Sequence, residues 1–188
     1  MLKTLMVDYP INYTGKELCS HWIYSKFHLL GDAIVAFIGE ANVSLDNMVD
    51  LTDVKEGDYI YSPLMLHFLV EHFNPDLELA IYRQRILISS IKEELEIFEI
   101  PVIRMGDDLF VRQAKLSVSV ATVSPTSTLI HTGLNIKTEG TPIKTSGLNQ
   151  LGVNDIPSFA NNVMKRYQHE LELIYEARCK VRSHKRGF

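Results

Sequence analysis

Polar side chains that could bind or activate a small molecule alternate with apolar ones along two neighbouring segments, 115–121 and 129–136. Successive side chains of an extended strand point to opposite faces, so each segment offers one apolar face and one face of small or polar groups. If the two strands pair with matching parity, the polar faces form one concave wall, and Gly133 lets a ligand approach the backbone closely. The predicted wall consists of Lys115, Ser117, Ser119, His131 and Asn135. An ordinary half-solvated sheet has the same alternation and is the alternative.

The two serines of this wall need a base nearby before either could act as a nucleophile, and the sequence offers Lys115 or His131. A lysine in an apolar pocket can lose its proton near neutral pH, so a Ser–Lys pair is chemically feasible. Alternating serines on a strand are also common as small polar filler. The chain has no Gly-x-Ser-x-Gly elbow, P-loop or Gly-x-Gly-x-x-Gly fingerprint. The residues therefore support a binding site better than any particular reaction.

Charged residues near these segments could orient a ligand. Asp107 and Asp108 could form an acid–base or metal-binding pair, or could accept hydrogen bonds from the N–H groups of their own Gly-Asp-Asp turn. Arg83 and Arg85 bracket the start of a predicted helix, and each could bind a phosphate or carboxylate through two hydrogen bonds. We therefore include all four residues in the predicted ligand-binding set, with Lys115 as the candidate catalytic residue.

A separate group, His67, Glu71 and His72, raises a metal site as an alternative. His67 and Glu71 would share one face of a helix, but the inverzincin motif His-x-x-Glu-His has a shorter spacing. A third ligand such as His131 would have to come from the sheet. A core histidine hydrogen-bonded to a carboxylate is the simpler interpretation, so we predict no metal centre.

The expected fold is α+β, a mostly antiparallel sheet flanked by helices. Four short runs rich in Val, Ile, Leu, Ser and Thr, separated by tight turns, predict an antiparallel meander. These runs are 101–105, 109–112, 115–123 and 127–137. The continuous apolar run 33–38 predicts a buried strand.

Helical spacing predicts a helix over residues 16–26, and Ser62 followed by Pro63 is typical of a helix start, so we expect a second helix from there to Phe73. Residues 77–82 predict a short strand, and 84–98 an amphipathic helix.

Ser158 predicts the N-cap of a final helix that reaches Arg182. Apolar residues at three- and four-residue steps predict that one face of this helix is buried. That face carries Phe159, Val163, Tyr167, Leu171, Ile174 and Ala177.

The run from Asp107 to Ser119 resembles the central motif of the biotin and lipoate protein ligases. In that family an Asn-Asp-Leu strand leads, seven residues after its Asp, to a Lys, and Asp108 precedes Lys115 by the same spacing. Residues 132–136, Thr-Gly-Leu-Asn-Ile, are similar to the family's Gly-Ile-Asn-Val strand. The resemblance implies the class II synthetase-like core, a place for Lys115 against an acyl carbonyl or adenylate phosphate, and Asn135 on the nucleotide side.

The sequence also departs from that family. Asp107 stands where the family has Asn, and Val118 stands where it has Gly. The Gly- and Arg-rich loop that holds the acyl-adenylate has no counterpart upstream, and the backbone N–H groups of such a loop hold the phosphates. Acyl or adenylyl transfer is therefore left open, and no cofactor is predicted. Over its whole length the chain is similar to an uncharacterised archaeal and bacterial family, domain of unknown function 366, which implies no activity.

The chain has 188 residues, a formal net charge of −4 and two cysteines outside any metal-binding spacing. We expect a single cytoplasmic domain with reduced thiols and without a membrane segment. Three functions remain open: an enzyme handling an acyl group or nucleotide, a non-catalytic module binding a small molecule or protein, and an RNA-associated protein. A homo-oligomer is also left open. RNA would contact the basic group Arg83, Arg85, Arg104, Arg112, Arg178, Lys180, Arg182, Lys185 and Arg186.

Overall fold

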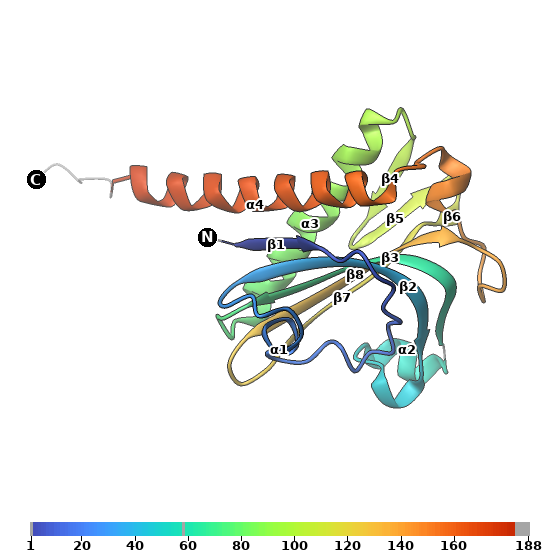
Figure 1. Ribbon diagram of the computed structural model, residues 1–188, viewed down its shortest axis with the longest axis horizontal. Coiled ribbons are helices and arrows are strands. Elements are labelled where there is room, and N and C mark those ends of the chain that lie inside the picture. Colours follow the sequence, from blue (N-terminus) through green and yellow to red (C-terminus); the bar gives the residue numbers. More distant parts are fainter. Residues whose placement is uncertain (1, 58, 183–188) are drawn as a thin grey trace, which may run out of the picture.

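The computed structural model describes residues 2–57 and 59–182 and is built on a five-stranded sheet (Figure 1). The strand order is β1-β2-β3-β8-β7, and every neighbouring pair is antiparallel except β1 and β2, which are parallel. The strands are β1 (Lys3–Met6), β2 (Ala33–Val43), β3 (Ile60–His72), β7 (Ser117–Val123) and β8 (Thr128–Lys137). With helices on the sheet, the predicted α+β class is confirmed.

A smaller antiparallel sheet, β4-β5-β6, follows in the chain. Its strands are β4 (Val102–Met105), β5 (Asp108–Val111) and β6 (Ala114–Lys115). The predicted meander thus exists but is divided between two sheets at Leu116. The Leu116 N–H donates to the Leu109 carbonyl of the small sheet, and the Leu116 carbonyl accepts from the Asn135 N–H of the large one.

The helix predicted from Ser62 to Phe73 is wrong, because this segment forms β3, the centre of the sheet. Neighbours on both sides and burial on both faces require a nearly continuous apolar run, which periodicity does not distinguish from a buried helix. Pro63 is accommodated because the pairing registers on both sides of β3 shift near it. A proline, which lacks an N–H donor, is tolerated at such irregularities.

The strand predicted over residues 77–82 is also wrong, because helix α3 (Leu77–Ile97) begins there and continues without a break. The Asp76 carboxylate accepts a hydrogen bond from the Leu79 N–H and caps the helix. The apolar stripe expected further along this helix is buried as predicted. The helix predicted over 16–26 is shorter, α1 (Trp22–Phe27), and the remaining helix before β3 is α2 (Leu51–Glu56).

Helix α4 (Ile156–Lys180) begins at Asp155, whose carboxylate accepts from the Ser158 N–H. Ser158 is therefore inside the first turn and is not the cap, since the aspartate three residues earlier takes that role. Phe159, Val163 and Tyr167 are buried as predicted, but Ile174 and Ala177 are exposed. The helix runs beyond the end of the sheet, so its last turns project from the body (Figure 1).

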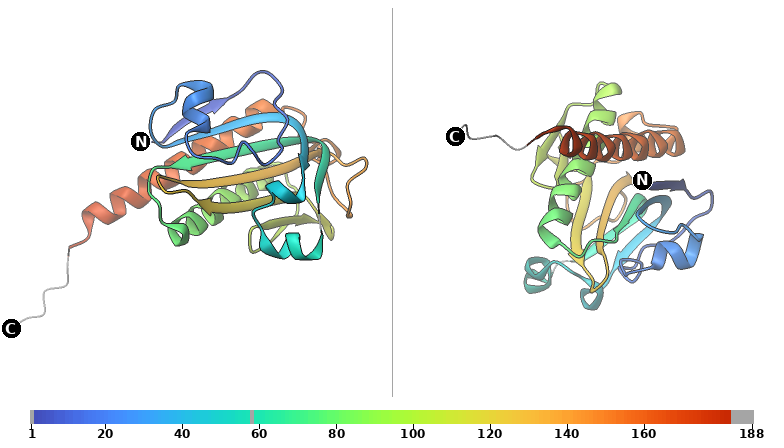
Figure 2. Two further views of the ribbon diagram at one scale, coloured as in Figure 1. Left: turned by 90° about the horizontal axis from the view of Figure 1, so that it is seen from below. Right: turned by 90° about the vertical axis from the view of Figure 1, so that its left-hand side faces the viewer.

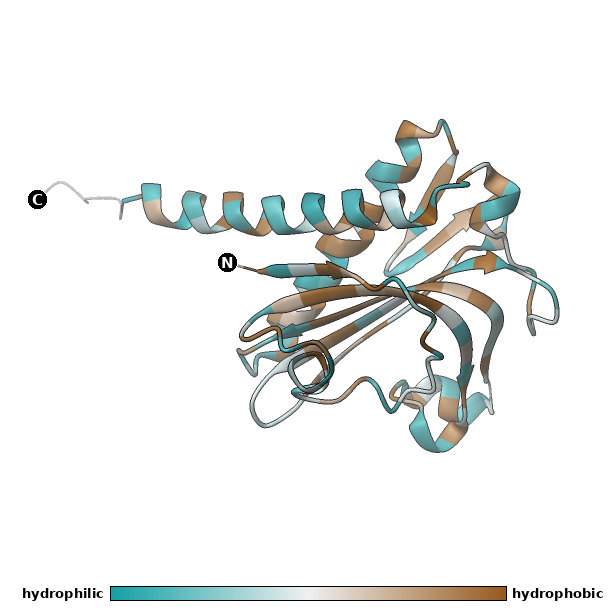
Figure 3. Ribbon diagram, in the orientation of Figure 1, coloured by the Kyte–Doolittle hydropathy of each residue, from teal (hydrophilic) through white to brown (hydrophobic). Residues whose placement is uncertain are grey.

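The sheet separates two apolar clusters. Helices α3 and α4 cover one face, while α1, α2 and the N-terminal segment lie on the other, around which the sheet curves (Figure 2). The face under α3 and α4 carries Leu66, Phe68 and Val70 of β3, while the opposite face carries Phe37 and Leu69. Figure 3 shows the hydrophobic residues concentrated on the strands, with hydrophilic residues prevailing on α4.

His72 connects α4 to the sheet. Its Nδ1 lies 2.9 Å from Asp32 Oδ2, and its Nε2 lies 3.0 Å from the Tyr167 hydroxyl. Burial lowers the pKa of His72, although the hydrogen bond to Asp32 opposes that effect. In the neutral ring Nδ1–H donates to the carboxylate and Nε2 accepts from the hydroxyl of Tyr167.

Removing that hydroxyl with Tyr167→Phe should therefore lower the free energy of unfolding by about 1–2 kcal/mol, because a buried acceptor loses its donor. Urea unfolding measures the change. Tyr24→Phe is the matched control, since Tyr24 is 44% exposed and its replacement should have little effect. Equal losses in the two variants would show that the His72–Tyr167 bond contributes nothing.

Candidate active site

A cavity of about 360 Å³ lies between the concave face of the sheet, the segment around α2 and the loop that follows β8. Its apolar lining includes Met65, Val118 and Val120. Seven of the predicted site residues also line it: Asp107, Asp108, Lys115, Ser117, Ser119, His131 and Asn135. The cavity thus brings Lys115 of the small sheet and Asn135 of the large one to a common space.

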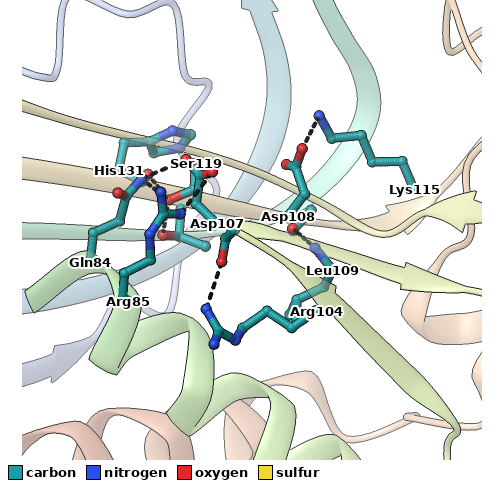
Figure 4. Close-up of polar contacts among 12 residues, drawn as sticks. Gln84, Arg85, Arg104, Asp107, Asp108, Leu109, Lys115, Ser119 and His131 are labelled. Atoms are coloured by element: carbon teal, nitrogen blue, oxygen red, sulfur yellow. Dashed lines mark hydrogen bonds and ion pairs between the residues drawn. The ribbon is translucent and has the colours of Figure 1, made fainter. Parts of the chain in front are cut away.

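The two carboxylates of the Gly-Asp-Asp turn bind side chains (Figure 4). Asp108 Oδ2 lies 2.9 Å from Lys115 Nζ, and the two side chains are 29% and 26% exposed, so a ligand can reach them. Asp107 lies 2.8 Å from an Arg85 nitrogen and accepts a 3.0 Å hydrogen bond from Gln84 Nε2. Lys115 is therefore paired with a carboxylate before any ligand arrives.

The expected matching parity of β7 and β8 is wrong. The register places Ser119 opposite Thr132 and Val120 opposite His131, and directly opposed residues share a face. His131 and Asn135 thus face the concave side with Val120, whereas Ser119 turns toward α3. The Ser119 hydroxyl contacts Gln84 Nε2 and the Thr132 hydroxyl, each at 2.9 Å.

Ser117 is buried and its hydroxyl accepts a hydrogen bond from the Leu109 N–H at 2.9 Å. Both serines therefore have structural partners, and Lys115 pairs with Asp108, so the geometry gives no support to a Ser–Lys nucleophile. Their contact with the cavity follows from position, because β7 is the last strand of its sheet and the cavity extends to Asp107 and Lys115.

Gly133 does not line the cavity. A Cβ at this position would lie 2.9 Å from Met65 Cε and 3.3 Å from Val118 Cγ2. The space above the glycine is therefore filled by side chains of the protein itself. The expectation that Gly133 admits a ligand to the backbone is wrong in this structure.

A buried pair of histidines forms part of the cavity wall. His67 Nδ1 lies 3.0 Å from His131 Nε2, and His67 Nε2 lies 3.3 Å from the Gly39 carbonyl. A carbonyl can only accept, so His67 carries its hydrogen on Nε2 and its Nδ1 accepts from His131 Nε2–H. Burial lowers the pKa of His67 to about 3 and also lowers the pKa of His131. Both rings are thus neutral, and His131 Nδ1 remains an acceptor.

Tyr13 lies against this pair and was not anticipated from the sequence. Its ring stacks on His131, with centroids 3.7 Å apart and planes 7° from parallel. The N-terminal segment reaches this position by crossing β2, where the Tyr13 N–H donates to the Glu40 carbonyl and the Asn42 N–H donates to the Tyr13 carbonyl. An isolated tyrosine far from β8 in the sequence gives no pattern that would indicate this contact.

The two predicted anion-binding arginines diverge, and neither lines the cavity. Arg85 is held on Asp107, while the charge of Arg83 acts on the group formed by Asp32, His72 and Tyr167. A shared phosphate site for Arg83 and Arg85 is therefore not formed in this structure.

The residues of the metal alternative also separate. The Glu71 carboxylate accepts hydrogen bonds from the His21 N–H and the Ser127 hydroxyl, while His67 pairs with His131. His67 is a core histidine, as the simpler interpretation holds, but the histidine bonded to a carboxylate is His72. Within residues 2–57 and 59–182, no three His, Cys, Asp or Glu side chains are grouped to hold a metal ion.

The fold is that of the biotin and lipoate protein ligases. The T. acidophilum protein Ta0514 with bound lipoic acid superposes with a TM-score of 0.60 at 13% identity, covering 90% of this chain and 86% of that one. A variant of the Aquifex aeolicus biotin protein ligase in complex with biotin gives 0.59 at 15% identity, covering 93% and 72%. At such identities the likeness is one of fold.

The chain belongs to the family named domain of unknown function DUF366, which it matches over residues 2–182. The uncharacterised protein MJ0805 of Methanocaldococcus jannaschii is 36% identical over 179 residues, covering 92% of this chain and 81% of that protein. A protein of unknown function from Pyrococcus horikoshi has a TM-score of 0.93 at 38% identity, covering 98% and 100%. None of the helices in the described part of this chain is long and apolar enough to cross a membrane.

Proposed function

We propose that this protein binds a small carboxylic acid, or its acyl derivative, in the cavity beside Lys115. The observation that carries the proposal is the presence of Lys115 and Asn135 on one cavity. Lys115 Nζ would contact the carboxylate or carbonyl, as a cation suited to an anionic oxygen. The apolar wall of Met65, Val118 and Val120 would contact the rest of the ligand. The volume of about 360 Å³ lies within the range of small-molecule sites, roughly 300–1,000 Å³.

The charge of the wall supports a ligand with one negative group over a polyphosphate. Among the described residues that line the cavity, Lys115 is the cation, and the anions are Asp50, Asp53, Asp107 and Asp108. Arg85 offsets Asp107 and Lys115 offsets Asp108, so little positive charge is left for a triphosphate. The lipoic acid and biotin of the fold's ligand-bound neighbours are ligands of the kind proposed here.

Ligand-induced thermal stabilisation tests the proposal. The protein is screened with lipoate, biotin and short acyl acids, with ATP for comparison. A ligand at about 100 times its Kd adds about 2.7 kcal/mol of stability, which is roughly 5–10 °C in Tm for a domain of this size. In Lys115→Ala we expect the shift from the same ligand concentration to be lost. Lys165→Ala, which removes an exposed lysine from α4, should keep it.

A second variant separates ligand contact from folding. In Asp108→Asn the carboxylate that pairs with Lys115 is removed, so acidic ligands should bind more tightly than to the wild type. If Lys115→Ala binds the ligand as well as the wild type, or Asp108→Asn binds it more weakly, Lys115 is not the ligand contact. Exchange of labelled pyrophosphate into ATP in the presence of the acid would show that adenylyl transfer accompanies binding.

A further inference from the structure

The end of α4 projects from the body, and its apolar side chains are exposed (Figure 1). We call Leu171 to Arg182 the projecting end. Within it Leu173 is 41% exposed, Ile174 44% and Tyr175 65%. Helices in proteins take most of their stability from packing of one face, and a short unsupported helix is marginal in water. The projecting end lacks such packing within the described part of the chain.

The exposed face continues the face that is buried earlier in the helix. Phe159, Val163 and Tyr167 recur every four residues and pack on the core, and Leu171 packs against its margin. The next positions on that face are Ile174 and Tyr175, at helical steps of three and four. The sequence therefore has the pattern of a buried face that extends past the end of the sheet. A second surface would complete its burial.

The charges on the projecting end and the residue before it indicate what that surface is. Three glutamates come first and three basic residues follow: Glu170, Glu172, Glu176, then Arg178, Lys180, Arg182. The sum is zero, which disfavours a nucleic acid, because the glutamates would repel its phosphates. A parallel copy of the helix would place like charges together. An antiparallel copy places acidic turns against basic turns.

We propose that the projecting end of α4 pairs antiparallel with the same segment of a second copy of this chain. The two-fold axis lies near Tyr175, so Ile174 and Tyr175 of both copies meet at the centre. Glu170 and Glu172 flank the apolar face and lie opposite the partner's Arg178 and the partner's Arg182. One surface patch meets itself across the axis, which is the arrangement that a two-fold dimer requires. This inference is independent of the ligand site.

Sedimentation velocity over a wide range of protein concentration tests the pairing. We expect the wild type to form a dimer that dissociates on dilution. Ile174→Asp combined with Tyr175→Asp should give a monomer whose circular dichroism shows an intact body, because both side chains are exposed in the isolated chain. Ile81→Asp is the matched control, since Ile81 is 39% exposed on α3, and it should leave the dimer unchanged.

Charge reversal tests the antiparallel direction. A variant with Glu170→Arg and Glu172→Arg should be monomeric alone, and so should one with Arg178→Glu and Arg182→Glu. Mixing the two should restore a dimer containing one chain of each kind. A wild type that stays monomeric throughout overturns the proposal, as does a failure of the mixture to associate. A monomer that binds tRNA at low salt would assign the same segment to RNA instead.

Discussion

Replacing Gly39 with alanine should lower the free energy of unfolding by about 3 kcal/mol or more, among the larger effects of a single substitution. A Cβ at this position would lie 1.9 Å from the Ile11 carbonyl oxygen and 2.5 Å from its carbon. Those atoms are backbone, held by the Ile11 N–H to Ile38 carbonyl hydrogen bond, so they cannot move aside cheaply. Urea unfolding at neutral pH measures the loss.

Gly133→Ala is the matched control, because Gly133 is also in a strand of the same sheet. Its added Cβ meets the flexible end of the Met65 side chain, which can rotate away, so we expect a loss of roughly 1 kcal/mol at most. The two glycines thus separate a backbone contact from a side-chain contact. Similar losses in both variants would contradict the assignment of Gly39 to the crossing of the N-terminal segment.

Acidification is the second large effect that we expect. The folded pKa of His67 is about 3, far below the roughly 6.5 of an unfolded histidine, because burial disfavours the charged ring. Between these values the unfolded chain binds a proton that the folded chain does not, so stability falls as pH falls. The contribution of His67 is fully present above pH 6.5 or so and decreases by about 1.4 kcal/mol per pH unit below it.

From pH 7 to pH 5 His67 alone should therefore remove about 2 kcal/mol from the free energy of unfolding. Burial lowers the pKa of His131 too, so the pair acts in one direction. Urea unfolding at a series of pH values gives the slope. His67→Gln should reduce that slope by about one proton, whereas His169→Gln, at an exposed position on α4, should leave it unchanged. Equal slopes in the two variants would mean that His67 does not titrate as a buried neutral ring.

The strands after α3 could be predicted from the sequence because their signals are local. Tight turns such as Gly106-Asp107 separate short β-rich runs, and β4 to β8 begin and end close to the predicted positions. The centre of the sheet could not be predicted in the same way. A strand buried on both faces has no alternation, so β3 has the apolar run of a helix, and Pro63 supplied a misleading start signal.

The site was predictable to the extent that it lies in one stretch of the chain. Lys115 and Asn135 follow from spacing and resemblance, and both line the cavity. Whether Ser119 and His131 share a face depends on a register that differs by one residue between two acceptable pairings. Tyr13 and the divergence of Arg83 from Arg85 depend on tertiary contacts. No local pattern contains that information.

The peptide at Leu116 bears on how tightly a ligand could be held. Its N–H bonds the small sheet, and its carbonyl accepts from both the backbone N–H and the side-chain amide of Asn135. The backbone of Lys115, one residue earlier, bonds the loop after β8 at Lys144 and Ser146. The two proposed ligand contacts are thus fixed relative to each other by main-chain bonds, independent of side-chain rotamers. Such preorganisation reduces the entropy lost on association, so a modest ligand could bind well through few contacts.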